Sequence, residues 1–400
     1  MISYNEALNA ILANVEIMPA ENIRIEDSVS RILAEDIYSG IEMPPFDKSA
    51  VDGYALNSRD VKEASIELRC IGLIQAGQDF KKPLKKGECV KIMTGAMLPK
   101  NADCVIMVED TQANGAFVRL LKAVKKRENV CIKGEDLKRG RKVLTKGEKI
   151  LISHLPLLAT VGRSYVKVVA APKAAVLNTG GEIIPVGRRL PENKIYNSNG
   201  PLLCSVLAQD GITPIDLGIA KDNVQDLKQA IKIGLKQDIL LVSGGVSMGD
   251  YDLVPQVLIS LGAKKIFHKV NIKPGKPLFF AVKDKTLIFG IPGNPVSNFL
   301  TYLIFIRPAL YKMMGYTGYR PMFREGFAKK PFHSKPGRKH FVPVKVFRKN
   351  VRYNLKVVVC HGSADILALS RADGFMVINE DTGSIKQNAK TQFITWKIRQ

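Results

Sequence analysis

The first hydrophobic pattern in the chain has helical spacing. Apolar residues recur at three- and four-residue intervals between positions 4 and 15, which predicts an amphipathic helix. Ser3 followed by Glu6 matches a capping box, in which each residue binds the backbone N–H of the other. A second short helix is expected at residues 27–33, and an extended segment at residues 35–41.

The chain then changes to short apolar runs broken by Gly, Pro and Asn over residues 47–141. Residues 66–71 alternate between apolar and polar side chains, and residues 89–93 and 104–108 have the composition of buried strands. This pattern predicts a mostly β domain. Residues 142–169 are expected to form a second β-rich element.

A third pattern begins at residue 174, where apolar runs alternate with helical spacing. Such alternation predicts a doubly wound α/β domain, with a parallel sheet covered by helices on both faces. The tail, residues 320–400, returns to short strands and turns. The α/β strands are expected at residues 174–177, 213–217, 239–242 and 286–289, and the helices at 224–235, 253–261, 296–313 and from 201.

Polar, glycine-rich loops follow three of these strands, at residues 178–182, 243–252 and 292–297. Ligands of open parallel sheets bind at the carboxyl ends of the strands, and glycine lets the backbone approach them closely. The sequence Lys273-Pro-Gly-Lys276-Pro adds two lysines on a stiff backbone. The three loops and the lysines together predict a site for an oxyanion or a phosphate.

Four carboxylates lie on loops of this kind: Asp52, Glu182, Asp222 and Asp252. Carboxylates beside a phosphate cradle are typical of Mg²⁺ sites, in which the metal also binds the substrate phosphate. Asp222 and Asp252 also precede expected helices, so helix N-capping remains open as their alternative role. The five histidines show no metal-ligand spacing and are interpreted as structural.

Charge and cysteine content narrow the class of protein. The chain has 60 Lys and Arg against 37 Asp and Glu, a net charge of +23, which indicates either an anionic partner or a generally lysine-rich surface. No nucleic-acid-binding motif is present, so no specific nucleic acid partner is expected. Six unpatterned cysteines and an apolar segment too short to span a bilayer (residues 299–310) predict a reduced, cytoplasmic protein with no membrane association.

Eight motifs occur in the order found in one known family. The chain resembles the molybdopterin molybdenumtransferases, the MoeA family, which includes the E domain of gephyrin. The resemblance extends over essentially the whole chain. It rests on MPPFDKSAVDGYA (43–55), IMTGAMLP (92–99), GED (134–136), NTGGEI (178–183), SGGVSMGDYD (243–252), KPGKP (273–277), GIPGNPVS (290–297) and HGSADILALSRADGF (361–375).

The resemblance implies an enzyme that inserts molybdate into adenylylated molybdopterin with release of AMP, assisted by Mg²⁺. It also implies an elongated homodimer in which the 47–141 domain contributes to the partner's cleft, and possible docking with a molybdopterin adenylyltransferase. A scaffold protein that has lost turnover is one alternative class, and a nucleic-acid-binding protein, motivated only by the net charge of +23, is another. The domains expected are a linker β domain (26–46 and 142–172), an inserted β-rich domain (47–141), a MogA-like α/β domain (1–25 and 173–318) and a barrel-like C-terminal β domain (319–400).

The functional residues of the family can be assigned to matching positions of this chain, motif by motif. The resemblance implies catalytic roles for Asp52, Glu182, Asp222, Asp252, Lys273 and Lys276, with Glu182, Asp222 and Asp252 holding the metal. It implies substrate binding by Thr94, Ser243, Gly244, Gly245, Ser247, Pro292, Gly293, Asn294, Pro295, Arg338 and Ser363. Gly181 and Asn223 stand where many members carry an additional acid, which leaves metal affinity and the choice between molybdate and tungstate open.

Overall fold

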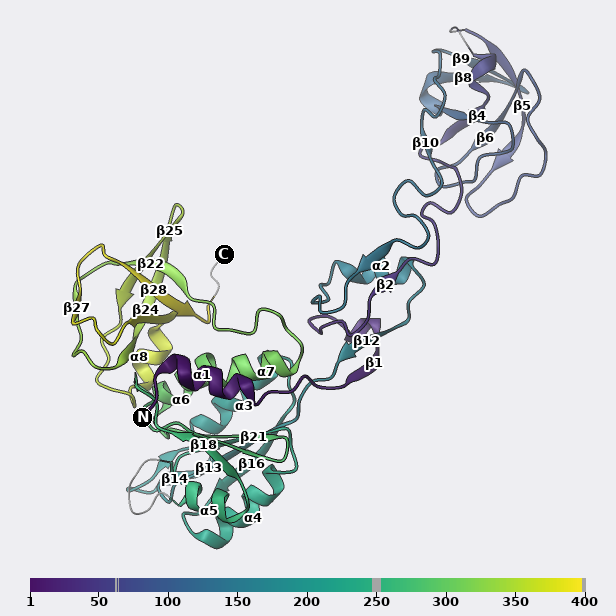
Figure 1. The fold of residues 1–400 in the computed structure, drawn as a ribbon. Coiled ribbons are helices and arrows are strands. Elements are labelled where there is room, and N and C mark those ends of the chain that lie inside the picture. Colours follow the sequence, from purple (N-terminus) through teal and green to yellow (C-terminus); the bar gives the residue numbers. More distant parts are fainter. Residues whose placement is uncertain (62, 64, 247–252, 398–400) are drawn as a thin grey trace. The chain divides into compact units, whose positions relative to one another are not determined.

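The computed structural model describes residues 1–61, 63, 65–246 and 253–397 and divides into two compact units (Figure 1). The larger unit contains residues 1–22, 30–34 and 167–400, and the smaller unit contains residues 23–29 and 35–166. Each unit has hydrophobic clusters of its own.

A six-stranded sheet lies at the centre of the larger unit, in the order β16-β13-β17-β21-β20-β18. The first four strands are parallel, as predicted, whereas β20 runs antiparallel to both of its neighbours. Only two residues connect β20 to β21, and Asp284 in this turn has a φ of 53°; so short a connection permits only antiparallel pairing. The strands are β13 (Ala174–Thr179), β16 (Pro214–Ala220), β17 (Ile239–Ser243), β18 (Lys264–His268), β20 (Phe279–Lys283) and β21 (Thr286–Ile291).

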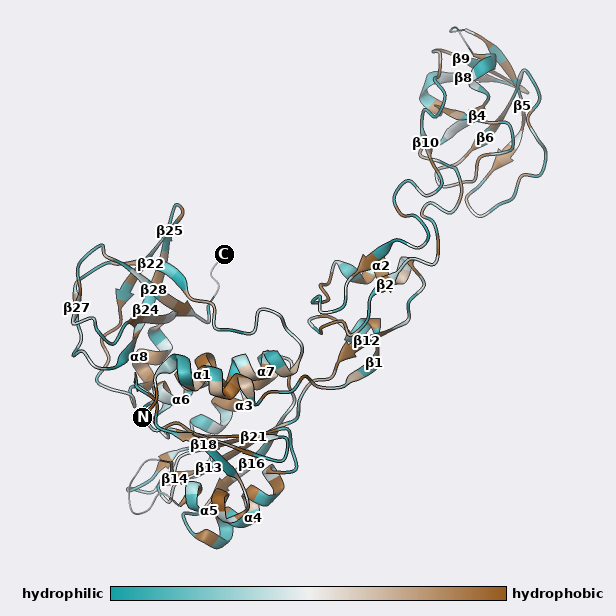
Figure 2. Ribbon diagram, in the orientation of Figure 1, coloured by the Kyte–Doolittle hydropathy of each residue, from teal (hydrophilic) through white to brown (hydrophobic). Residues whose placement is uncertain are grey.

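Helices cover both faces of this sheet, which confirms the doubly wound prediction. Along β17, Leu241 packs into one cluster and Leu240 into the other, because successive side chains of a strand point to opposite faces. Apolar residues therefore follow the strands and the inner sides of the helices (Figure 2). One face carries α1 (Tyr4–Ala13), α3 (Asn199–Gln209), α6 (Pro295–Thr301) and α7 (Arg307–Met313), and the other carries α4 (Val224–Gly234) and α5 (Val254–Ser260).

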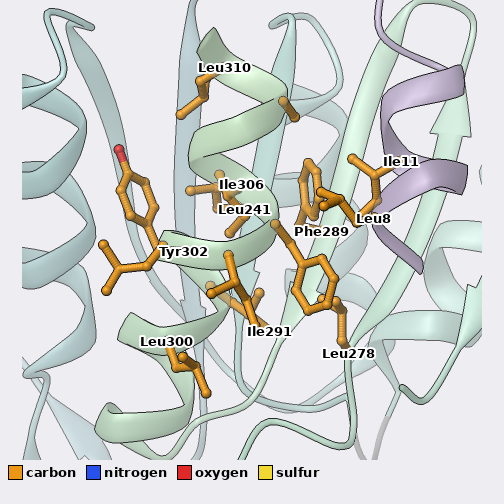
Figure 3. Close-up of a cluster of buried hydrophobic side chains, with 14 of the residues drawn as sticks. Leu8, Ile11, Leu241, Leu278, Phe289, Ile291, Leu300, Tyr302, Ile306 and Leu310 are labelled. Atoms are coloured by element: carbon orange, nitrogen blue, oxygen red, sulfur yellow. The ribbon is translucent and has the colours of Figure 1, made fainter. Parts of the chain in front are cut away.

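The N-terminal helix packs on the C-terminal helix of the same domain. Figure 3 shows Leu8 and Ile11 of α1 beside Phe289 of β21, with Ile306 nearby. The capping box is confirmed: the Ser3 N–H donates to the Glu6 carboxylate at 2.7 Å, and the Glu6 N–H donates to the Ser3 hydroxyl at 3.2 Å.

The expected helix over residues 296–313 contains a π-helical segment, Tyr302–Ile306, between α6 and α7. The buried carboxylate of Asp210, at the end of α3, binds side chains of this helix. It accepts hydrogen bonds from Arg307 Nε at 2.7 Å, from the Tyr302 hydroxyl at 2.6 Å and from the Tyr311 hydroxyl at 3.0 Å.

The tail forms a closed five-stranded barrel, in the order β24-β25-β22-β28-β26 with β26 pairing back to β24. The short strand β19 (Ile272–Lys273) adds to β24 in parallel, with Lys273 opposite His340. This pairing connects the lysine loop of the α/β domain directly to the barrel. The barrel elements are β22 (Arg324–Ala328), β24 (Lys339–Lys349), β25 (Arg352–Val357), α8 (Ile366–Arg371), β26 (Gly374–Ile378) and β28 (Lys390–Thr395), with β23 (Phe332–His333) and β27 (Ser384–Ile385) paired beside them.

The smaller unit contains a second six-stranded sheet, in the order β7-β4-β6-β5-β9-β8. Gly53, which belongs to the DGYA motif, lies so close to β7 that a Cβ atom would be 1.8 Å from the Ile106 carbonyl oxygen, so only glycine fits there. The strands are β4 (Gly53–Leu56), β5 (Glu67–Ile74), β6 (Glu88–Ile92), β7 (Cys104–Met107), β8 (Thr111–Asn114) and β9 (Phe117–Leu120). Short pairs in this unit are β2 (Ile37–Tyr38) with β11 (Lys142–Leu144) and β3 (Lys48–Ser49) with β10 (Val130–Cys131). The chain also contains the paired strands β1 (Ala20–Arg24) and β12 (Tyr165–Val169).

One local prediction is wrong, and another segment contains a helix that was not expected. The helix expected at residues 27–33 is only a 3₁₀ turn, Ile25–Asp27, because the Ser28 hydroxyl donates to the Ile25 carbonyl and Ser30 has a φ of 70°. The element expected to be β-rich over residues 142–169 has β11 and β12 at its two ends, and it also contains a helix that was not expected, α2 (His154–Thr160), which buries Leu158. All six cysteines are free. Within the described ranges, every helix is too short or too polar to cross a bilayer.

Candidate functional site

The loops after β13 and β16 meet at Asp222. Its carboxylate accepts one hydrogen bond from the Thr179 hydroxyl and another from the Gly181 N–H, the latter at 2.6 Å. Asp222 therefore does not act as an N-cap: Asn223 caps α4 by accepting from the Asp226 N–H at 2.9 Å. This contact joins two of the sequence-predicted loops at the carboxyl edge of the sheet.

Two carboxylates flank the Gly180-Gly181 turn. A Cβ atom on Gly180 would lie 2.7 Å from a Glu182 carboxylate oxygen, and one on Gly181 would lie 3.7 Å from Asp222 Oδ2. Hard oxygen donors on both sides of one turn suit Mg²⁺. Over the described ranges no three His, Cys, Asp or Glu residues are grouped to hold a metal, and the third expected ligand, Asp252, lies outside them together with Ser247.

The loop after β17 packs directly on the first loop. Gly244 and Gly245 have φ values of 98° and 61°, and a Cβ atom on Gly244 would lie 2.2 Å from the Thr179 carbonyl oxygen. Gly293 of the third loop lies beside Gly244, because a Cβ atom on Gly293 would be 3.7 Å from Gly244 Cα. The three glycine-rich loops therefore form one continuous surface.

Sequence reasoning missed a buried asparagine network beneath these loops. The Ser243 hydroxyl accepts hydrogen bonds from the side-chain amides of Asn199, at 3.0 Å, and Asn298, at 2.9 Å. The same two amides donate to the carbonyls of Gly293, at 2.6 Å, and Pro292, at 3.3 Å. The network fixes the PGNP turn to the end of β17. Its only sequence signal was an asparagine in an apolar helical pattern at position 298.

A pocket of about 870 Å³ lies between the lysine loop, the start of α6 and the barrel. The sequence-predicted residues that line it are Lys273, Lys276, Pro292, Asn294, Arg338 and Ser363. The Asn294 side-chain amide donates to the Ser363 hydroxyl at 2.8 Å, which connects the PGNP turn to the barrel. Lys335 adds a further cation, and no carboxylate is among the described lining residues. The pocket is therefore suited to an anion.

Three histidines interpreted as structural, His333, His340 and His361, also line this pocket. Burial, followed by the charges of Lys273 and Arg338, lowers the pKa of His340 to about 4. His340 is therefore neutral at physiological pH, with its Nδ1 2.9 Å from the Ser334 hydroxyl. These positions follow from strand pairing in the barrel, which residue spacing does not reveal.

Two predicted site residues, Asp52 and Thr94, meet in the smaller unit. The Thr94 N–H and hydroxyl both donate to Asp52 Oδ1 at 2.7 Å, and these bonds lower the pKa of the exposed carboxyl. Asp47 instead has a local structural contact, since it accepts a hydrogen bond from the Lys133 N–H at 2.7 Å. Ser49 is buried, and its hydroxyl donates to the Val51 carbonyl at 2.5 Å.

Three family descriptions match successive parts of the chain. Residues 2–162 match the MoeA N-terminal region (domains I and II), residues 175–312 a probable molybdopterin-binding domain, and residues 326–396 the MoeA C-terminal region (domain IV). The three matched regions together define a protein of the MoeA type that contains a probable molybdopterin-binding domain.

Individual relatives narrow this class. The molybdopterin molybdenumtransferase of Staphylococcus aureus strain Mu50 is 38% identical over 322 residues, covering 78% of this chain and 76% of the relative. The protein of that name from Staphylococcus epidermidis strain ATCC 35984 is 36% identical over 319 residues, with the same coverage. A crystal structure of a molybdopterin biosynthesis MoeA protein from Pyrococcus horikoshii matches with a TM-score of 0.87 and 33% identity, over the full length of both chains. The chain belongs to the molybdopterin molybdenumtransferase (MoeA) family.

Proposed function

We propose that the protein acts in molybdenum cofactor biosynthesis, and that it inserts molybdate into adenylylated molybdopterin with release of AMP. The observation that carries this proposal is the arrangement along one sheet edge. A carboxylate-flanked glycine turn lies at the β13–β16 end, and a cationic pocket lies at the β21 end, joined by Gly244 and Gly293. Such a site suits a long substrate in which a diphosphate lies at a distance from the group that accepts the oxyanion.

The pocket residues supply charge and orientation for the oxyanion. Lys273 and Lys276 stand on a loop held by the β19–β24 pairing, so their positions are fixed before an anion arrives. Preorganised cations lower the barrier more than mobile ones, since little rearrangement is needed during the reaction. Neutral His340 leaves the net positive charge of the pocket to the lysines and to Arg338.

The acidic end fits a divalent metal. Glu182 and Asp222 would hold Mg²⁺, with Asp252 as the third predicted ligand. When bound, Mg²⁺ would neutralise charge that develops on the diphosphate as AMP leaves. Hydrogen bonds from the Thr179 hydroxyl and the Gly181 N–H keep the Asp222 carboxylate oriented for this role.

The test is release of AMP from adenylylated molybdopterin in the presence of molybdate and Mg²⁺, scored together with formation of active cofactor. Lys276→Ala should abolish release, because it removes a pocket cation. Lys329→Ala removes a lysine that is absent from the pocket lining and should leave release unchanged. Full AMP release by the Lys276 variant would contradict the proposed role of the pocket.

We also propose a cytoplasmic homodimer in which Asp52 serves the partner's site. An Asp52→Ala chain and a Lys276→Ala chain, each inactive alone, should then regain activity when mixed dimers form. Docking of a molybdopterin adenylyltransferase remains a proposal that co-sedimentation of the two proteins would test.

A further inference from the structure

Two of the six cysteines lie directly opposite each other in the smaller unit. Cys70 of β5 and Cys89 of β6 are register partners in a parallel strand pair. Neighbouring strands of a sheet are about 4.8 Å apart, and the Cα atoms of the two residues in a disulfide are usually about 4.4–6.8 Å apart. The strand pairing therefore places these two residues at a separation that a disulfide can bridge.

The side chains of the two cysteines also point to the same face of the sheet. Both belong to the hydrophobic cluster of the smaller unit, in which Cys89 is fully buried and Cys70 packs against it from a half-buried position. Burial raises the pKa of the Cys89 thiol to about 12, and a direct interaction with the Cys70 thiol adds to this effect. The two sulfur atoms are therefore neighbours.

The two thiols differ in their access to solvent. Cys70 is half-buried, and its thiol donates to the Gly72 carbonyl at 3.4 Å. A bulge follows it directly, because β5 advances three residues to Leu73 while β6 advances two, from Cys89 to Lys91. A bulge interrupts the ladder of hydrogen bonds, so the backbone beside Cys70 can adjust as the disulfide torsion forms.

We propose that Cys70 and Cys89 are a site of oxidative modification, at which a peroxide joins them in a cross-strand disulfide. Peroxide oxidises the more accessible Cys70 thiol to a sulfenic acid and releases one water molecule. The Cys89 sulfur then attacks the Cys70 sulfur, and the hydroxyl group leaves with the Cys89 proton as a second water molecule. The two thiols together lose two electrons and two protons, and the peroxide is reduced to water.

The order of these steps follows from burial. The Cys89 thiol remains protonated at neutral pH because its pKa is raised, and a protonated thiol reacts slowly with oxidants. Cys89 therefore acts only as the resolving thiol, after Cys70 has been oxidised beside it. The inference goes beyond the proposed function, since neither cysteine belongs to the candidate site.

The disulfide would close the loop of residues 71–88, which connects β5 to β6. Closing a loop of this length restricts the unfolded chain and so stabilises the folded one. We expect the unfolding midpoint of the smaller unit to rise by about 5–10 °C on oxidation and to return on reduction.

The experiment treats the folded, full-length protein with hydrogen peroxide, alkylates the remaining thiols and digests the product with trypsin without reductant. The expected product is a peptide of residues 70–81 joined to a peptide of residues 87–91, two hydrogens lighter than their sum. Dithiothreitol should separate the two peptides. Calorimetry of the oxidised and reduced protein measures the shift of the midpoint.

Cys70→Ser should abolish both the joined peptide and the shift. The matched control is Cys131→Ser, which removes another half-buried thiol of the smaller unit, opposite Lys48, and should change neither. Peroxide that leaves Cys70 and Cys89 unjoined in the parent protein, or joins either to a different cysteine, would overturn the proposal. So would a joined peptide that forms only after unfolding in urea, because the folded register would then not be its cause. A cross-linked protein with an unchanged midpoint would overturn the stabilising effect.

Discussion

Gly244→Ala is expected to disable the site by displacing Thr179. A Cβ atom at position 244 would lie 2.2 Å from the Thr179 carbonyl oxygen, whereas real Cβ atoms stay beyond 3.0 Å. The loop or the end of β13 must therefore move by about 0.8 Å. Thr179 is the residue whose hydroxyl binds Asp222, so this movement disturbs the acidic end of the site.

The energetic cost has two sources. The φ of 98° at Gly244 is unfavourable for alanine, at about 1–2 kcal/mol. Forcing an extra methyl group into a packed position costs typically about 1–3 kcal/mol more. We expect the free energy of unfolding of the larger unit to fall by about 2–5 kcal/mol, and molybdate-dependent AMP release to be lost.

Denaturant unfolding followed by tryptophan fluorescence measures the stability change. The single tryptophan, Trp396, packs against Phe299 and Phe375 in the larger unit, so its signal follows that unit. Gly181→Ala is the stability control, because a Cβ there would meet its nearest atom at 3.7 Å. Equal unfolding midpoints for the two variants, or a Gly244→Ala protein with full AMP release, would refute the reasoning.

Three further predictions concern other parts of the chain. Asp210→Asn leaves the partly buried Arg307 guanidinium without its counter-charge, and should lower the unfolding free energy measured by Trp fluorescence by up to about 3 kcal/mol. Burial and nearby cations lower the pKa of His340 to about 4 in the folded protein. As the pH drops from about 6.5 towards 4, the histidine is protonated in the unfolded chain but not in the folded one, so the stability of the folded protein falls. His340→Gln should remove this pH dependence of stability. Thr94→Val removes a hydroxyl donor and should raise the pKa of Asp52, which moves the acidic limb of the pH–rate profile to higher pH.

Each of these has an outcome that would contradict it. For Asp210, the comparison is Glu16→Gln, which breaks the exposed pair with Lys285 and should cost at most about 1 kcal/mol; equal losses would show that burial does not set the cost. An unchanged stability–pH curve in the His340 variant would mean that another group titrates there. For Thr94, carbon-13 NMR of labelled aspartate gives the Asp52 pKa directly, and an unchanged value would exclude the hydroxyl as a cause.

The α/β domain was predictable because the polarity of its residues indicates directly whether each position is buried. Leu240 and Leu241 are both apolar because parallel strands are buried on both faces, and the glycine loops follow these strands in the sequence. The lysine loop was predictable from its prolines. Arg338 and Ser363 were predicted as site residues from the resemblance of their motifs to the family. No pattern of residue spacing pointed to them.

What the sequence did not reveal depends on contacts between distant segments. His340 enters the pocket because β19 pairs with β24, across 66 residues of intervening chain that no local pattern connects. Asn199 and Asn298 act together only after α3 and α6 converge on Ser243. The missed helix α2 has a single fully buried leucine, Leu158, so its hydrophobic period was too weak to distinguish from a strand.

The pairing of β19 with β24 also determines how the chain can be recombined. The lysine loop contributes a strand to the barrel sheet through this pairing. The barrel therefore cannot be exchanged as an independent domain, although its strands are contiguous in sequence. A chimera that takes residues 319–400 from a relative would replace Arg338 and Ser363. It would retain Ile272 and Lys273, which would then have to pair with the β24 strand of the relative. Functional grafts should therefore carry residues 270–277 together with the barrel, and the two segments are expected to change together as the family diverges.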